Sequence, residues 1–225
     1  MSPKIIAFTG LDGCGKTTHV KALRDYLKMR GLKVISFHQF ESIIFRFQKM
    51  NPFIKKLHLY AARPGTVEFQ YSLNNYSLNN KEKSTFLRFV AAMYIIIFGL
   101  LRTWLKILFN LKYDIIIFDR YYIDELIRAK WKFKINFKSF RWICHLAPRP
   151  YKLFFLRISP EVAWQRTEQG EVAKNLFFQK GKDYIEWINW LKIYWNILDI
   201  DIDGKTFQQI QQSIRNNLLF TCISN

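Results

Sequence analysis

Cysteine and histidine are scarce in this sequence. The 225-residue chain has three cysteines, Cys14, Cys144 and Cys222, and four histidines, with no CxxC pair and no metal-ligand spacing among them. An odd number of widely spaced cysteines argues against a disulfide framework and fits a reducing cytoplasm best. Neither a metal site built on His and Cys nor a histidine general base is expected.

Acidic residues are also few. Asp and Glu total 17 against 35 Lys and Arg, which gives a formal net charge of +18. So basic a chain favours an anionic partner: nucleotide phosphates, nucleic acid or an acidic membrane surface. Charge alone does not choose among these partners, and a compositional bias of the source would also contribute to the surplus.

The sequence has no apolar run of membrane-spanning length. The apolar stretch at 89–101, "FVAAMYIIIFGLL", is bounded by Arg88 and Arg102. It falls short of the about 20 residues that a membrane-spanning helix needs. We interpret it as part of a core helix, with a membrane-surface role as the alternative. The apolar run near the N-terminus is too short for a secretory signal and is interpreted as a first strand.

The chain does contain the apolar residues needed for a packed core. Half of its residues are hydrophobic and 17% are aromatic, which argues against disorder and favours one domain over 1–225. A strand at 5–9, a helix at 17–29 and a strand at 34–37 form a unit typical of parallel α/β sheets. Further strands are expected at 113–118, 153–158 and 200–202, and further helices at 86–111, 121–130, 139–144, 184–198 and 207–219, with a helix start at 159–166.

A glycine-rich loop follows the first strand. Residues 10–18, "GLDGCGKTT", fit the pattern G-x-x-x-x-G-K-[ST]. Backbone N–H groups wrap a phosphate chain only where side chains do not obstruct them, and the following helix directs its positive end at the phosphates. Lys16 would reach the β- and γ-phosphates, and the Thr17 hydroxyl would ligate Mg²⁺. The residues expected to bind ATP are Gly10, Leu11, Asp12, Gly13, Cys14, Gly15, Lys16, Thr17 and Thr18.

Other interpretations of this loop remain open. A glycine-rich turn that binds nothing is the alternative for the whole segment. Asp12 would either direct its carboxylate at an acceptor or metal, or cap a turn. Cys14 is interpreted as a small residue that fills the loop. The motif and the alternating elements together predict a three-layer P-loop NTPase fold, in which helices flank a five-stranded parallel sheet. An irregular loop is expected at 60–84.

The stretch 115–127, "IIIFDRYYIDELI", holds a second motif. An apolar run that reads as a buried strand ends abruptly in Asp119 and Arg120. Strands one and three should lie close together in a sheet of this kind, so this charged pair should emerge beside the loop at 10–18.

Several segments resemble thymidylate kinases. "IAFTGLDGCGKTTHVKALRDYL" resembles their opening, and "FDRY" at 118–121 resembles their D-R-[YF] motif. "PYKLFFLRISPEVAWQR" resembles their fourth strand and lid entry, and "IDIDGKTFQQIQQSIRNNL" their last strand and helix. The resemblance implies an ATP- and Mg²⁺-dependent nucleotide kinase, typically a dimer. The apolar 86–111 segment would be a possible dimer interface.

The resemblance also implies roles for individual residues. Arg120 would bridge the acceptor phosphate and the transferring group, and Asp119 would lie beside the metal. Arg166 would close over the ATP phosphates from a lid at 166–183. Arg63 would hold the acceptor phosphate, with a solvated loop arginine as the alternative. The candidate catalytic residues are Lys16, Asp119, Arg120 and Arg166; the candidate metal ligands are Thr17 and Asp119; the candidate acceptor-binding residues are Asp12, Arg63, Arg120 and Tyr121. Lys174, Lys180 and Lys182 are weaker lid candidates.

The chain also departs from the family pattern. Thymidylate kinases usually carry R-E-P-G-G-T, whereas "ARPGT" at 62–66 is the nearest run here. They usually carry a Ser three places after D-R-Y, where this chain has Asp124. We interpret Asp124 and Glu68 as surface carboxylates, with contact to an acceptor hydroxyl or base as the alternative. The predicted reaction is transfer of the ATP γ-phosphoryl group to a nucleoside monophosphate, dTMP by resemblance. The alternatives are a kinase of a nucleoside or other small hydroxyl acceptor, and a nucleotide-dependent binding module at a membrane face or on nucleic acid.

Overall fold

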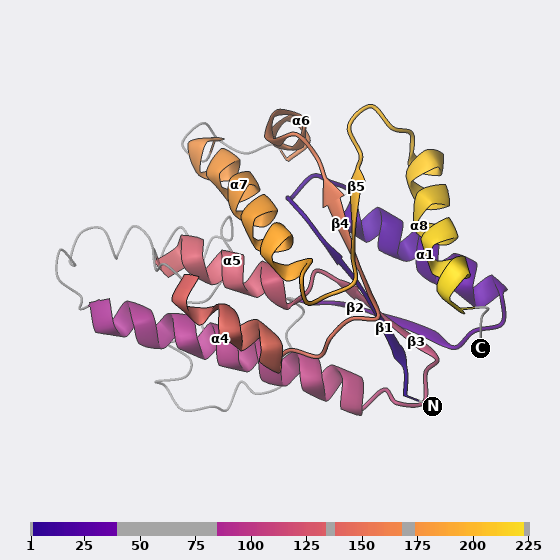
Figure 1. Ribbon diagram of the computed structural model, residues 1–225, viewed down its shortest axis with the longest axis horizontal. Coiled ribbons are helices and arrows are strands. Elements are labelled where there is room, and N and C mark those ends of the chain that lie inside the picture. Colours follow the sequence, from indigo (N-terminus) through magenta and orange to yellow (C-terminus); the bar gives the residue numbers. More distant parts are fainter. Residues whose placement is uncertain (1, 40–84, 134–137, 168–173, 223–225) are drawn as a thin grey trace.

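A twisted parallel sheet lies at the centre of the protein (Figure 1). The computed structural model describes residues 2–39, 85–133, 138–167 and 174–222. Its five strands are arranged in the order β2-β3-β1-β4-β5, and every neighbouring pair is parallel. The strands are β1 (Lys4–Thr9), β2 (Val34–His38), β3 (Ile115–Asp119), β4 (Lys152–Arg157) and β5 (Ile197–Asp201).

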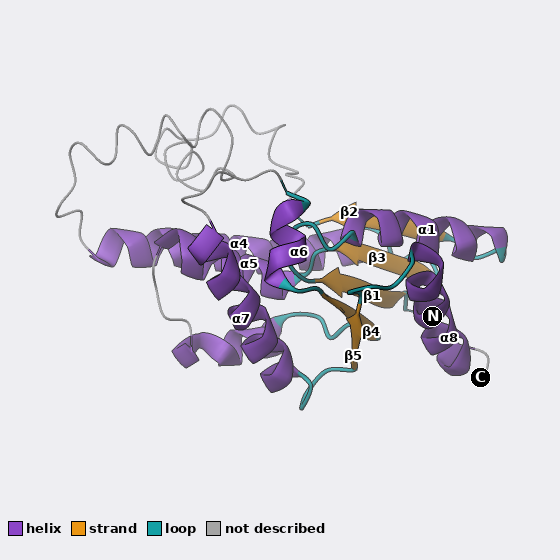
Figure 2. Cartoon of the chain, turned by 90° about the horizontal axis from the view of Figure 1, so that it is seen from above, coloured by secondary structure: helices purple, strands orange, loops and turns teal. Residues whose placement is uncertain are grey.

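Helices cover both faces of this sheet. One side carries α1 and α8, which contact each other, and the other carries α4, α5 and α7 (Figures 1 and 2). This arrangement confirms the predicted three-layer fold. The helices are α1 (Lys16–Met29), α4 (Thr85–Leu108), α5 (Tyr122–Phe133), α6 (Pro160–Gln165), α7 (Lys174–Leu191) and α8 (Phe207–Cys222), with a 3-10 helix η2 (Lys138–Leu146).

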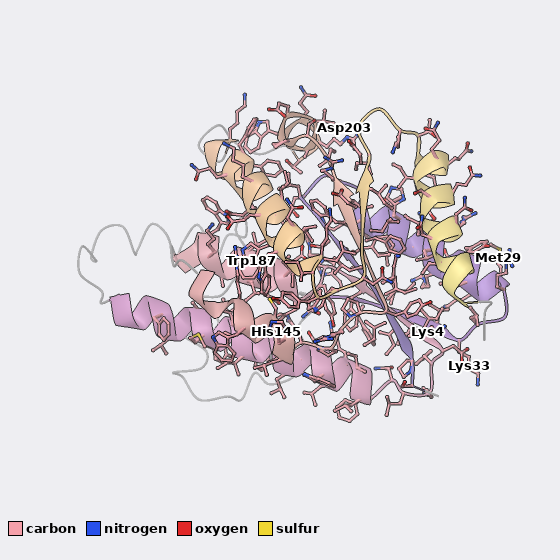
Figure 3. The ribbon with its side chains drawn as sticks, in the orientation of Figure 1. Lys4, Met29, Lys33, His145, Trp187 and Asp203 are labelled. Atoms are coloured by element: carbon pink, nitrogen blue, oxygen red, sulfur yellow. The ribbon has the colours of Figure 1, made fainter. Side chains whose placement is uncertain are left out.

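All five strands end at the same edge of the sheet. Figure 3 shows Lys4 and Lys33 at the edge where strands begin, and Asp203 at the edge where they end. β3 is buried at every position because it pairs with β1 on one side and β2 on the other, and helices cover both of its faces. The register pairs Phe8 of β1 with Asp119 of β3, so the segments that follow these strands start side by side.

Helix α4 is one continuous helix over most of the segment expected to be helical at 86–111. Its inner side buries Ala92 and Ile96 against the core. Its outer side exposes Ile97, Leu101 and Leu108, which recur at helical spacing. Among the described residues, no helix has the length and apolar character needed to cross a membrane. The expected core helix is therefore confirmed for one face of α4.

Both ends predicted for the helix at 184–198 are wrong. α7 begins at Lys174 and ends at Leu191, and β5 begins at Ile197. The chain turns after Leu191, and Trp195 returns to the core, where its ring lies 5.9 Å from that of Tyr121. Aromatic residues keep helical spacing across this turn, so the pattern did not mark the end of the helix.

Candidate phosphate-binding site

The loop between β1 and α1 is closely packed around its glycines. Gly10, Gly13 and Gly15 have φ angles of 144°, 85° and 79°. A Cβ on Gly10 would lie 2.5 Å from the Leu156 carbonyl oxygen, and one on Gly13 would lie 2.6 Å from the Ala163 carbonyl oxygen. Side chains are therefore excluded at Gly10 and Gly13 by both backbone conformation and space, as a phosphate-wrapping loop requires.

Lys16 directs its ammonium group into this loop. Its Nζ atom donates hydrogen bonds to the carbonyl oxygens of Gly10, at 2.8 Å, and Leu11, at 2.6 Å. The Lys16 side chain starts from the first residue of α1, where the helix dipole adds positive potential. Phosphate oxygens entering the loop would meet a cation that is already in place. Cys14 is buried, with its sulfur 3.4 Å from Nζ, which agrees with its interpretation as a loop filler.

Thr17 and Asp119 meet beside the loop. The Thr17 hydroxyl donates to Asp119 Oδ2 at 2.6 Å, and Asp119 is buried. Its other oxygen, Oδ1, is buried and has no hydrogen-bond partner. Mg²⁺ prefers oxygen ligands and is usually held by one or two side chains together with substrate phosphates. A hydroxyl beside a carboxylate with an unused buried oxygen fits that preference.

Arg120 follows directly in the chain and approaches the loop from its other side. Its φ of 70° is the one left-handed value among the non-glycine residues that the structure describes. The guanidinium donates from Nη2 to Asp12 Oδ1, and its Nη1 lies 3.9 Å from Asp124 Oδ1. Burial works against the charge of Arg120, but Asp12 and Asp124 outweigh it and raise the pKa of the guanidinium further.

Asp12 is held between two cations. Lys180 of α7 donates to Asp12 Oδ2 at 3.2 Å, opposite the bond from Arg120. Burial alone would raise the pKa of Asp12, but Lys180, Arg120 and Lys16 together hold it well below the usual range. Asp12 is therefore ionised at neutral pH. The contact also shows that Lys180, expected to be a weak lid candidate, reaches the phosphate loop.

Asp124 is not a surface carboxylate, which corrects the prediction. It lies in the first turn of α5, is only 2% exposed, and accepts hydrogen bonds from Thr9, the Tyr121 backbone and Tyr184. Its distant partners, Thr9 in β1 and Tyr184 in α7, could not be recognised from the sequence. The local signal was its position in a helix first turn, where a carboxylate commonly accepts a backbone N–H.

The Tyr121 side chain does not reach the site, which corrects its assignment to the acceptor. Tyr121 is fully buried, and its hydroxyl donates to the Pro148 carbonyl oxygen. The ring packs in edge-on contact with Phe118, 5.4 Å away, and against Trp195. The side chain therefore anchors the start of α5 in the core.

The lid segment is only partly as expected. Arg166 is exposed at the end of α6, next to Thr167, whose methyl group would lie 3.0 Å from a Cβ on Gly13. Its contact with ATP phosphates stays a prediction. Residues 174–183 form the start of α7, which bounds the loop through Gly181, where a Cβ would lie 3.3 Å from Leu11. Arg63 and Glu68 lie outside the described residues.

The order of the parallel strands and the glycine-rich loop after β1 are those of a P-loop NTPase fold. Two structures of deoxyadenosine kinase from M. mycoides match 95% of this chain and 98% of theirs, at 17% identity. The TM-score is 0.57 for the structure with the products dCMP and a flexible dCDP, and 0.54 for the one with dATP. These matches confirm the fold.

Sequence comparison gives shorter matches. Thymidylate kinases from Thermoanaerobacter pseudethanolicus and Caldanaerobacter subterraneus subsp. tengcongensis are 49% and 51% identical to the chain over 35 residues. The matched part covers 16% of this chain and only 17% of those enzymes. No family model matches the chain. The local matches and the common fold support the resemblance to thymidylate kinase-like P-loop proteins.

Proposed function

We propose that the protein transfers the γ-phosphoryl group of Mg·ATP to a nucleoside monophosphate, with dTMP as the acceptor that the resemblance implies. The observation that supports this most strongly is the convergence of Lys16, the Thr17–Asp119 pair and Arg120 at one edge of the sheet. In open α/β sheets, ligands bind beyond the carboxyl ends of the strands. Phosphoryl transfer needs positioned positive charge there and little covalent chemistry from the protein.

Each residue then has a distinct role. Lys16 and the loop N–H groups bind the donor phosphates. Thr17 and Asp119 would hold Mg²⁺, which neutralises charge on the β- and γ-phosphate oxygens when bound. Arg120 would leave Asp12 to bind the acceptor phosphate and the group in transfer. Arg166 would approach the donor phosphates from the end of α6.

A nucleoside is the second candidate acceptor. It is favoured by the position of the Asp12 carboxylate beside Arg120, because a neutral hydroxyl needs a base to accept its proton, and movement of Arg120 to a phosphate would remove one of the cations that lower the pKa of Asp12. A monophosphate acceptor needs no such base, since its attacking oxygen is already ionised. The full-length structural similarity to deoxyadenosine kinase points the same way.

An acceptor screen separates these candidates. The protein would be incubated with Mg·ATP and, in parallel, dTMP, dCMP, dAMP, thymidine, deoxycytidine and deoxyadenosine, and ADP formation would be followed by a coupled assay. We expect acceptor-dependent ADP formation with a monophosphate, and formation only with nucleosides would select the second candidate. ADP formation that is independent of every acceptor, or none at all, would contradict the proposal.

A further inference from the structure

The buried carboxylate of Asp124 joins three separate parts of the protein. Oδ2 accepts from the Thr9 hydroxyl and from the Tyr121 backbone N–H, both at 2.8 Å. Oδ1 accepts from the Tyr184 hydroxyl, also at 2.8 Å. Thr9 is the last residue of β1, immediately before the loop, and Tyr184 belongs to α7. One side chain thus connects the strand before the phosphate loop, the turn after β3 and the helix that carries Lys180.

The environment of Asp124 suits a side chain that accepts several hydrogen bonds. All three hydrogen-bonding neighbours donate, and a carboxylate only accepts. A carboxamide of the same shape would carry no charge, and its NH₂ group would require the Thr9 or Tyr184 hydroxyl to turn and accept instead of donating. Burial raises the pKa of Asp124 above its ordinary value, and the charges of Arg120 and Lys16 and its hydrogen bonds offset only part of that shift.

Asp124 holds Arg120 in two ways. The bond from the Tyr121 N–H fixes the turn in which Arg120 adopts its left-handed backbone conformation. The 3.9 Å approach of Asp124 Oδ1 to Nη1 places a second carboxylate beside the guanidinium, at a different nitrogen from the one that binds Asp12. The guanidinium therefore lies between two carboxylates. If Asp12 released it to a phosphate, Asp124 would still hold it at the site.

From this geometry we infer that Asp124 is a positioning residue, which fixes the Arg120 guanidinium for the reacting phosphates and ties its position to the loop and to α7. This inference rests on the proposed function for its kinetic consequence. A Ser hydroxyl could accept the Tyr121 N–H, but it would supply no charge to Arg120 and is too short to reach three donors.

Asp183 provides a matched control. It is a buried carboxylate next to Tyr184 in the sequence, and it accepts from Lys130 at 2.6 Å and from the Trp131 indole at 2.8 Å. Like Asp124, it connects α5 with α7, but its described contacts do not include Arg120. Asp183→Asn should therefore weaken the same helix interface without disturbing the guanidinium.

The first test is kinetic. With the acceptor identified in the screen, Asp124→Asn and Asp124→Ser should lower kcat by about 100-fold, the size expected for a misplaced catalytic group. KM for ATP should stay close to the wild-type value. Tyr184→Phe, which removes one hydrogen bond, should show a smaller loss of kcat, and Asp183→Asn should keep wild-type kcat. Equal losses of kcat in Asp124→Asn and Asp183→Asn would overturn the inference, because they would indicate a structural role alone.

The second test does not depend on activity. The Arg120 Nε atom is buried, so its N–H signal in a ¹⁵N NMR spectrum, assigned with Arg120→Lys, should exchange slowly with water. We expect fast exchange in Asp124→Asn and Asp124→Ser, and slow exchange in Asp183→Asn. Tyr184→Phe serves as the folded variant if the Asp124 variants do not fold, and it should show intermediate exchange. An unchanged Arg120 signal in every folded Asp124 or Tyr184 variant would overturn the inference. Absence of phosphotransfer in the wild-type protein would instead overturn the proposed function.

Discussion

The two halves of the candidate site are held in place by different means. The loop at 10–18 is held mainly by backbone packing, since Gly10 and Gly13 lie within contact distance of the main chain of β4 and α6. The turn at 120–124 is held by a buried side chain, because Asp124 accepts hydrogen bonds from donors in β1, the turn and α7. The first half depends on residues that are close in sequence, and the second on residues far apart.

This difference predicts how each half should fail. Substitutions in the loop should remove phosphate binding or strain the backbone locally. Substitutions around Arg120 should leave ATP binding intact and affect the step that involves the acceptor. The following variants test that contrast, from the largest expected effect to the smallest.

Replacing Lys16 should have the largest effect. Lys16→Ala removes the ammonium group inside the loop, and loss of one preorganised donor to transferring phosphates should lower kcat by about 1,000-fold. ATP affinity, measured by fluorescence titration with a labelled nucleotide, should fall as well. Lys21→Ala, at an exposed position of the same helix, is the control. Wild-type turnover in Lys16→Ala would contradict the role of the loop.

Replacing Arg120 tests the other half. Arg120→Lys keeps the charge but loses the planar fork that lies between Asp12 and Asp124. We expect kcat to fall by about 100-fold while ATP affinity stays near wild type, because donor binding belongs to the loop. Steady-state kinetics and nucleotide titration give the two values. Arg157→Lys, at an exposed arginine at the end of β4, is the control and should change neither value. If Arg120→Lys lost as much ATP affinity as Lys16→Ala, the two halves of the site would not differ as proposed.

Two glycines with similar backbone angles separate crowding from backbone strain. Gly13 and Gly204 have φ angles of 85° and 68°, but a Cβ on Gly204 would meet nothing within 4 Å. Gly204→Ala should lower the free energy of unfolding by about 1 kcal/mol through strain alone. Gly13→Ala should lower it by about 2 kcal/mol more, because the new methyl group meets the Ala163 carbonyl oxygen. Urea unfolding measures both, and equal losses would show that close approach in the loop is unimportant.

The smallest effect concerns His19, which packs behind the loop. Burial lowers its pKa from 6.5 to about 4, and its Nδ1 lies 2.8 Å from the Gln211 amide nitrogen. The unfolded chain takes up a proton at higher pH than the folded one, so stability from this residue is lost as pH falls from 6.5 toward 4. His19→Gln should reduce this pH dependence of the free energy of unfolding. His145→Gln, at an exposed position, should retain the pH dependence of the wild-type protein. If His19→Gln also retained it, His19 would not be the source of that pH dependence.

The same contrast explains what the sequence could predict. The sequence predicted the roles of Lys16, Thr17 and the glycines because a phosphate-binding loop needs fixed residue types at fixed spacing. It also predicted the strand that ends at Asp119, because an apolar run precedes that residue. The contacts of Asp124, Lys180 and Tyr184 depend on how α7 packs against the loop, which local patterns do not encode. The end of α7 was missed because Tyr194 continues the helical spacing of Trp187 and Trp190 in the turn that follows Leu191.

The most direct test of the central claim is ³¹P NMR of the products formed from Mg·ATP and the best acceptor of the screen. The account expects the ATP γ signal to disappear, the signals of ADP to grow, and a new signal from the phosphorylated acceptor to appear in equal amount. The Lys16→Ala protein should leave the spectrum unchanged. Release of inorganic phosphate without acceptor modification, or unchanged ATP with the wild-type protein, would contradict phosphoryl transfer as the function of this site.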